Sequence, residues 1–141
     1  MKNEQNSEQN KQPIEWSKLG FEYTKTDYRF SATWEDGKWS DGDLLTSEYI
    51  TLHEGSPSLH YAQQCFEGLK AQTAADGRIL LFRPELNAER MRNTSLRLSM
   101  PVVPTELFLH GVHEAVLNSI WINCTDISKF EILDAPCGNG P

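Results

Sequence analysis

The sequence predicts an α+β domain, with helices packed on one face of a mainly antiparallel sheet. Two segments of β-forming residues come first, each containing an Asp-Gly dipeptide, and two segments of helical periodicity follow them. Strands joined by tight turns pair antiparallel, and the helices after them can cover one face of the resulting sheet. The length of 141 residues suits one domain with a modest core.

Composition divides the chain into three parts. Residues 2–12 contain no apolar side chain, so we expect residues 1–13 to be a disordered polar tail. Residues 14–120 carry the predicted strands and helices and form the folded domain. Residues 121–141 show no sustained hydrophobic period and end in a Pro- and Gly-rich stretch, so no element is predicted there.

Two β-hairpins are expected in the first half of the domain. Residues 28–39 place the dipeptide at 36–37 between β-forming residues, and an Asp-Gly pair suits the positive φ angles of a two-residue turn. Residues 66–83 repeat the pattern, with the dipeptide at 76–77 just before the apolar run at 79–82. This second hairpin should be longer and better buried.

Two helices are expected after the hairpins. The first begins at Pro84, whose ring suits the first helical turn, with Glu85 near the positive end of the helix dipole. The segment 101–104, which begins and ends with proline, separates it from the second. We expect Thr105 to cap that second helix, whose apolar residues recur at near-helical spacing as far as Ile120.

Charge and composition exclude several partners. With 13 Lys and Arg against 20 Asp and Glu, the net charge of -7 opposes binding to nucleic acid or to anionic membrane surfaces. The longest apolar run, Ile79–Phe82, is far shorter than the roughly 20 residues that span a bilayer. The first residues do not resemble a signal peptide, so we expect a cytoplasmic protein. Three widely spaced cysteines indicate neither a disulfide framework nor a zinc site, and no metal is predicted.

The segment SPSLHYAQQCFEGLK is the most unusual in chemical terms. His60 as a general base and Cys65 as a nucleophile would make a Cys/His hydrolase, provided the fold brings them together and lowers the thiol pKa. The alternative interpretation is structural. Tyr61 and Phe66 would then be core aromatics, and Gly68 would mark a bulge or a close backbone approach.

Four arginines follow the second hairpin and offer a second candidate site. They are Arg83, Arg90, Arg92 and Arg97. The first two, and also Arg90 and Arg97, lie about two helical turns apart, and guanidinium groups there could hold an anion such as a phosphate. Alternatively, the arginines form solvated pairs with Glu85 and Glu89 on the same helix.

Three stretches together resemble the branched-chain amino acid aminotransferases: LGFEYTKTDYRFSATWEDGKWSDGDL, SPSLHYAQQCFEGLKA and GRILLFRPELNAERMRNTSLRLSMPVVP. The resemblance covers about residues 14–118. It implies the small N-terminal domain of a class IV, fold-type IV enzyme that binds pyridoxal phosphate. Such enzymes transfer amino groups between leucine, isoleucine or valine and 2-oxoglutarate, usually as homodimers. D-amino acid aminotransferases and aminodeoxychorismate lyases share this cofactor site and are the alternative relatives.

The resemblance implies roles for individual residues. Arg90 matches the arginine that holds the cofactor phosphate, a role suited to a planar group that is always charged. Tyr61 and Phe66 match positions that line the substrate pocket, and Gly68 matches the glycine that closes their motif. Glu67 is also matched, but no physical role can be assigned to it from the sequence.

The departures from the family pattern are equally informative. In the family the second domain supplies the Schiff-base lysine and the acidic partner of the pyridine nitrogen, so we expect this chain to lack them and to be inactive alone. No catalytic residue is therefore assigned. Residues 121–141 stop resembling the family, which suggests a frameshifted or prematurely terminated reading frame. A non-enzymatic alternative is a truncated domain that binds full-length subunits.

Overall fold

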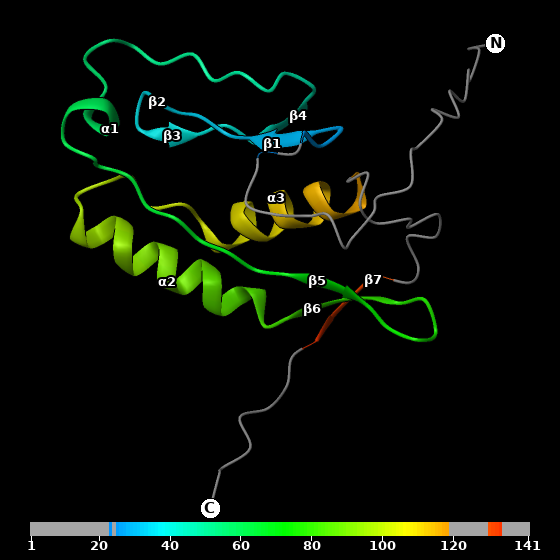
Figure 1. The fold of residues 1–141 in the computed structure, drawn as a ribbon. Helices are drawn as coiled ribbons and strands as arrows, with labels where there is room; N and C mark the ends of the chain where they lie inside the picture. The colour runs from blue at the N-terminus through cyan, green and yellow to red at the C-terminus, as the bar shows by residue number, and fades with distance from the viewer. Residues whose placement is uncertain (1–22, 24, 119–129, 134–141) are drawn as a thin grey trace, which may run out of the picture.

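The computed structural model describes residue 23, residues 25–118 and the backbone of residues 130–133. Within these ranges the fold is α+β, as the sequence predicts, and Figure 1 shows α3 lying between the β1 and β4 strands and helix α2. The elements, in chain order, are β1 (Arg29–Ser31), β2 (Trp34–Glu35), β3 (Lys38–Trp39), β4 (Asp43–Leu45), α1 (Pro57–His60), β5 (Ala71–Thr73), β6 (Ile79–Phe82), α2 (Pro84–Arg97), α3 (Thr105–Leu117) and β7 (Phe130–Leu133).

The first hairpin forms where it was predicted, from β2 and β3. Asp36 and Gly37 connect the strands with φ angles of 51° and 80°, which is the two-residue turn that the dipeptide favours. Trp34 and Trp39 face each other across the pair with their ring centroids 5.6 Å apart. The indole nitrogen of Trp39 donates to the carbonyl of Val102, 2.8 Å away, and so ties this hairpin to the entry of α3.

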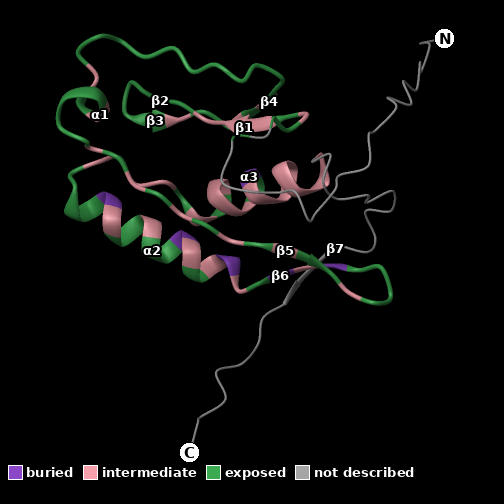
Figure 2. Ribbon diagram, in the orientation of Figure 1, coloured by how far each residue is buried: buried purple, intermediate pink, exposed green. Residues whose placement is uncertain are grey.

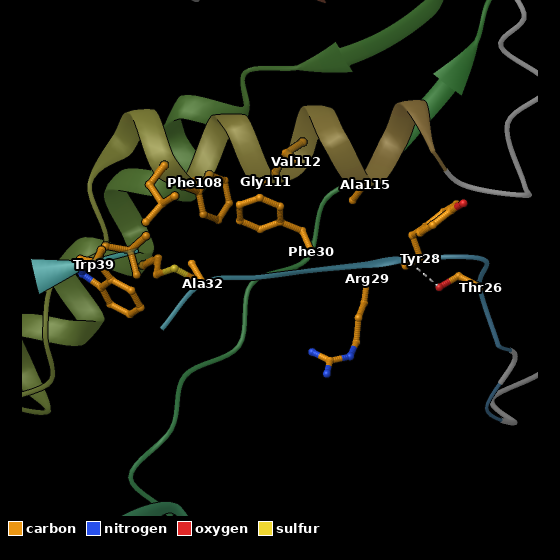
Figure 3. A pocket seen from close by; sticks show the side chains of 13 residues that line it. Thr26, Tyr28, Arg29, Phe30, Ala32, Trp39, Phe108, Gly111, Val112 and Ala115 are labelled. Carbon is orange, nitrogen blue, oxygen red and sulfur yellow. Dashed lines mark hydrogen bonds between the residues drawn. The ribbon is translucent and has the colours of Figure 1, made fainter. Parts of the chain in front are cut away.

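Strand β1 pairs antiparallel with β4 and packs against α3 through the ring of Phe30. Figure 3 shows this ring facing α3 at Gly111. A Cβ atom at Gly111 would lie 2.6 Å from the ring, and one at Gly42 would lie 2.1 Å from it. Both distances are too short for a real contact, so the two glycines provide the space that the ring occupies.

The second hairpin forms from β5 and β6 and is longer than the first, as predicted, but its turn is not the two-residue turn that Asp76 and Gly77 suggested. The amide of Ala74 donates to the carbonyl of Arg78 over 2.8 Å, and the amide of Gly77 donates to the carbonyl of Ala74 over 2.9 Å. Gly77 has a φ of 83°. This geometry is a three-residue loop with glycine at the left-handed position, a common alternative to the two-residue turn.

Strand β6 carries the most deeply buried apolar side chains of the described residues. Ile79 is 2% exposed and Leu81 is 1% exposed, whereas Phe82, the last residue of this strand, is 65% exposed. Figure 2 shows buried positions on β6 and along α2. Better burial of the second hairpin is therefore confirmed. Strand β7, from the segment in which no element was predicted, pairs with β6 in parallel.

Helix α2 begins at Pro84, as predicted. Arg83 precedes it in a left-handed conformation with a φ of 47°, and Pro84, Ala88 and Ser95 are buried along one side. Helix α2 packs against α3. Asn87 of α2 contacts the segment before β5 through Glu67 and Gly68.

The prediction that Thr105 caps α3 was wrong. Thr105 is the first helical residue, and Pro104 occupies the cap position with a ψ of 143° and no side-chain hydrogen bond. Because Thr105 already has helical backbone angles, its hydroxyl does not reach back to the next amides as a cap residue would. The described helix ends at Leu117, and the predicted end at Ile120 lies outside the described residues.

The strands form three small sheets rather than one. The pairs β1–β4, β2–β3 and β5–β6 are antiparallel, as predicted, and β7 adds a parallel pair to the last sheet. In the described part of the chain, no helix is long and apolar enough to cross a membrane. The predicted tail at residues 1–13 lies outside the described residues, as does most of 121–141.

We expect Gly111→Ala to destabilise the domain by about 1–3 kcal/mol through overpacking against Phe30. Alanine is otherwise about 1 kcal/mol better than glycine inside a helix, so the sign of the effect tests the contact. Urea unfolding measures it. In the double variant Phe30→Leu/Gly111→Ala the loss should be smaller than the sum of the single losses. A Gly111→Ala chain more stable than the wild type would show that the packing between β1 and α3 is loose.

Candidate functional site

The segment 63–68 runs in extended form along α2, in the opposite direction to the helix (Figure 1). Ala62 turns the chain out of the short helix α1 with a φ of 52°. The side-chain amide of Gln63 then donates to the carbonyl of Leu98, 2.7 Å away at the end of α2. Further on, the side-chain amide of Asn87 donates to the carbonyl of Gly68 over 3.0 Å. These bonds fix the segment against the helix at both ends.

Exposure alternates along this segment because successive side chains of an extended chain point to opposite sides. Cys65, Glu67 and Leu69 are half-buried, whereas their neighbours are exposed. Tyr61 is 83% exposed and Phe66 is 89% exposed. The alternation therefore turns Glu67 toward α2 and Phe66 outward, whereas Tyr61 is exposed at the end of α1, before the alternation begins. The hypothesis that Tyr61 and Phe66 are ordinary core aromatics is wrong for this structure.

Glu67 forms a two-pronged ion pair with Arg90 of α2. The Nε atom of Arg90 donates to Oε1 of Glu67 and its Nη2 atom donates to Oε2, each over 2.6 Å. The side-chain amide of Asn87 donates to the same Oε2 over 3.0 Å. Asn87 and Arg90 stand three residues apart, so they lie on one face of the helix.

The two side chains of the pair differ in exposure, and each stabilises the charged form of the other. The side chain of Glu67 is 5% exposed and that of Arg90 is 66% exposed. The hydrogen bonds from Arg90 lower the pKa of Glu67 below its ordinary value, with Asn87 adding to the effect and burial opposing it. The same bonds raise the pKa of Arg90. Glu67 is therefore a carboxylate at neutral pH, and the arginine it holds reaches solvent.

The structure brings together some of the residues singled out from the sequence. Arg90 and Gly68 lie at this ion pair, the latter through its bond to Asn87. Among the described contacts, no hydrogen bond or ring contact joins Tyr61 or Phe66 to Arg90. Sequence reasoning missed Asn87 altogether and left Glu67 without a role. The three-residue spacing of Asn87 and Arg90 on a predicted helix was the available signal.

Two of the four arginines, Arg83 and Arg92, form local ion pairs, whereas Arg90 and Arg97 line an open hollow. Arg92 pairs with Glu89 at 3.3 Å and Arg83 with Glu85 at 3.7 Å, so the interpretation as local pairs is confirmed for these two. Arg90 lines a hollow of about 460 Å³ on the outer side of α2. The other residues that line it are Leu86, Glu89, Asn93, Thr94, Arg97 and Leu98.

The structure does not assemble the Cys/His pair. A ring nitrogen of His60 lies 2.6 Å from the carbonyl oxygen of Glu54, and no hydrogen bond between His60 and Cys65 occurs among the described residues. Cys65 belongs to the half-buried side of the extended segment. The described residues contain no group of three or more His, Cys, Asp or Glu side chains placed to hold a metal ion. Nucleophilic chemistry at this cysteine has no support.

A larger, apolar cavity of about 580 Å³ lies between β1 and α3. Figure 3 shows Phe30, Phe108 and Val112 around it, with Arg29 pointing away from α3. The guanidinium of Arg29 donates to the carbonyls of Ser47 and Tyr49 at 2.8 and 3.1 Å. The cavity thus offers shape and apolar surface without a charged group for a polar ligand, and the ion pair on α2 is the better candidate site.

The fold and the site together define an α+β domain with an exposed, fixed arginine on its first long helix. No family model matches the chain. Over 110 residues the chain is 57% identical to a branched-chain-amino-acid aminotransferase of Haemophilus influenzae. This match covers 77% of this chain and 32% of that protein. The chain is 48% identical over 114 residues to the protein of that name from Helicobacter pylori, covering 80% and 34%. A chloroplastic Arabidopsis thaliana relative of the same name is 43% identical over 111 residues, covering 77% and 27%.

The chain is therefore homologous to the branched-chain-amino-acid aminotransferases, and it spans about a third of the length of the curated relatives it matches.

We expect stability to depend on pH through Glu67. Its pKa is lowered on folding from the ordinary 4.5, so its contribution is complete above that value and disappears as the pH falls through the lower folded value. The thermal midpoint of the wild type should therefore fall more steeply than that of Glu67→Gln from about pH 5 to about pH 3. The control Glu85→Gln removes a carboxylate of α2 that does not contact Arg90 and should keep the steeper fall. Parallel curves for wild type and Glu67→Gln would contradict the assignment.

Proposed function

We propose that this chain carries the side of an aminotransferase site that holds the phosphate of pyridoxal phosphate and the apolar part of an amino-acid substrate. The parent reaction is amino transfer between leucine, isoleucine or valine and 2-oxoglutarate, in the setting of branched-chain amino acid biosynthesis in the cytoplasm. The single observation that carries the proposal is the exposed guanidinium of Arg90, anchored by Glu67, in a chain 57% identical to a branched-chain-amino-acid aminotransferase.

The residues present fit the phosphate end of the cofactor. Arg90 is 66% exposed, is held at one edge, and borders the hollow on the outer side of α2. A planar guanidinium with donors to spare suits a phosphate group, which accepts two parallel hydrogen bonds. When bound, pyridoxal phosphate supplies an electron sink for reactions at the α-carbon of an amino acid. This chain would contribute charge and orientation at the phosphate.

The two outward aromatic rings fit the substrate side of the proposal. Tyr61 and Phe66 leave most of their surface uncovered; Phe66 stands on the segment whose other side is anchored to α2, and Tyr61 stands at the end of α1 just before it. Large apolar rings suit the branched aliphatic side chain of the substrate, and the tyrosine hydroxyl can orient a polar group. We propose that both rings form part of the pocket wall in a complete enzyme, which in this family is a homodimer.

None of the lysines in the printed sequence is proposed as the residue that binds the cofactor covalently. The lysines within the described ranges, Lys25, Lys38 and Lys70, are exposed. A lysine with that role needs burial or cationic neighbours to lower its pKa. Lys25 instead lies 3.8 Å from the carboxylate of Glu48. We therefore expect the 141-residue chain alone not to transaminate.

Binding of pyridoxal phosphate and of pyridoxal to the wild-type chain and to Arg90→Ala tests this function. We expect the wild type to bind the phosphorylated compound at least about tenfold more tightly than pyridoxal, the order expected for a charge-assisted contact to phosphate. Arg90→Ala should lose that difference. Arg97→Ala on the same helix is the matched control and should lose less. Isothermal titration measures the affinities.

Three outcomes would contradict the proposal in different ways. Equal affinities of the wild type for the two compounds would remove the phosphate role of Arg90. A lysine adduct trapped by borohydride would show that one of the chain's own lysines bonds to the cofactor. Glutamate formed from leucine and 2-oxoglutarate by the purified chain would show that it is active without further residues.

The exposed side chains also favour a second candidate, a domain that binds full-length aminotransferase subunits. Leu59, Tyr61 and Phe66 are 60%, 83% and 89% exposed and lie close together in the sequence. Exposed apolar side chains gathered on one segment mark interaction sites, including contacts between domains. A chain of this kind would bind subunits without catalysing the reaction itself.

Co-purification with a full-length branched-chain aminotransferase distinguishes this candidate. We expect the tagged wild-type chain to retain the full-length subunit and the variant Tyr61→Ser/Phe66→Ser to retain at least about fivefold less, since each buried aromatic contributes more than 1 kcal/mol at such contacts. Phe82→Ser, which removes an exposed ring on another element, is the control. Failure of the wild type to retain the subunit would dispose of the candidate.

A further inference from the structure

Glu67 binds one particular edge of the Arg90 guanidinium. A guanidinium has five N–H donors, arranged so that two different edges can each bind a pair of oxygens. Glu67 occupies the edge formed by Nε and Nη2, with both contacts at 2.6 Å. The other edge, formed by Nη1 and the outer side of Nη2, donates to no acceptor in the described part of the chain. A second pair of oxygens can therefore bind while the first stays in place.

The carboxylate is the fixed member of the pair. Its side chain is 5% exposed, and Asn87 holds both its Oε2 atom and the neighbouring carbonyl of Gly68 at 3.0 Å. Arg90 reaches it from the other side and is 66% exposed. Release of Arg90 would leave a buried carboxylate with a single amide donor, which is unfavourable. The pair should therefore persist when an anion arrives.

We propose that Glu67 is a positioning residue. It holds Arg90 by the edge formed by Nε and Nη2, so that the other edge, formed by Nη1 and Nη2, is oriented in advance for the oxygens of a phosphate monoester. The inference rests on the function proposed above and assigns a role to Glu67 and Asn87 within that site. A long arginine side chain that is already ordered loses less conformational entropy when it binds. The gain appears as affinity for the anion.

The opposite role for Glu67 is competition, and the two roles predict effects of opposite sign. The charge of Glu67 cancels that of Arg90, so electrostatics alone would make Glu67→Gln bind an anion more tightly. Positioning makes the same variant bind more weakly, because the guanidinium is no longer held. Glu67→Gln keeps the shape of the side chain and so isolates this difference.

The experiment combines the NMR signal of the Arg90 Nε–H group with titration of the 141-residue chain by inorganic phosphate. Arg90→Lys assigns the signal, because it keeps the charge and removes the group. We expect a signal protected from solvent exchange in the wild type and lost or averaged in Glu67→Gln. The phosphate affinity of Glu67→Gln should be about three- to tenfold lower, which corresponds to the entropic cost of ordering the side chain.

Control variants separate the positioning effect from general changes in charge and folding. Glu85→Gln removes a carboxylate from the same helix without a contact to Arg90, so it should bind phosphate as tightly as the wild type or slightly more tightly. Asn87→Ala weakens the hold on Glu67 and should lower phosphate affinity in the same direction by a smaller factor. If Glu67→Gln does not fold, Asn87→Ala decides the sign.

Each remaining outcome contradicts the inference in a recognisable way. Tighter phosphate binding by Glu67→Gln, or by Asn87→Ala, would show that Glu67 competes with the anion, while the phosphate role of Arg90 would stand. An Nε–H signal equally protected in wild type and Glu67→Gln would show that another group orders the arginine. A wild-type Arg90 signal that responds to neither inorganic phosphate nor pyridoxal phosphate would overturn both the inference and the function proposed for this site.

Discussion

The bond between Glu67 and Arg90 connects two parts of the chain that otherwise follow separate courses, the extended segment before β5 and helix α2. Its two contacts of 2.6 Å cross 23 positions of sequence, and Asn87 reinforces them with bonds to the same carboxylate and to the backbone of Gly68. With the bond from Gln63 to the end of α2, these contacts determine which side of the extended segment faces the helix. The outward position of the Phe66 ring follows from that choice.

A second constraint, independent of the first, positions β1 and the first hairpin against α3. The ring of Phe30 fits between Gly42 and Gly111, which brings β1 close to α3, and Trp39 ties the first hairpin to the chain entering that helix. Helix α3 in turn packs on α2, so the two halves meet at the helices. At the site on α2, Arg90 is exposed while its partner Glu67 is buried.

These arrangements give the chain a clear chemical character. It offers a guanidinium fixed at one edge, a hollow beside it and two aromatic rings with most of their surface uncovered. A fixed guanidinium suits an anion, and uncovered aromatic rings suit an apolar side chain. This character agrees with a chain that spans about a third of its aminotransferase relatives.

By itself the sequence determined the α+β class, both hairpins and the start of α2, because Asp-Gly turns, a proline in the first helical turn and apolar runs act through local backbone geometry. It also drew attention to Arg90 and to the motif before β5. Only the tertiary structure decided that Glu67 and Asn87 hold that arginine, that Tyr61 and Phe66 point outward, and that β7 joins β6 in parallel. These features depend on which segments meet in space, and local propensities carry no information about a contact between residues 23 positions apart.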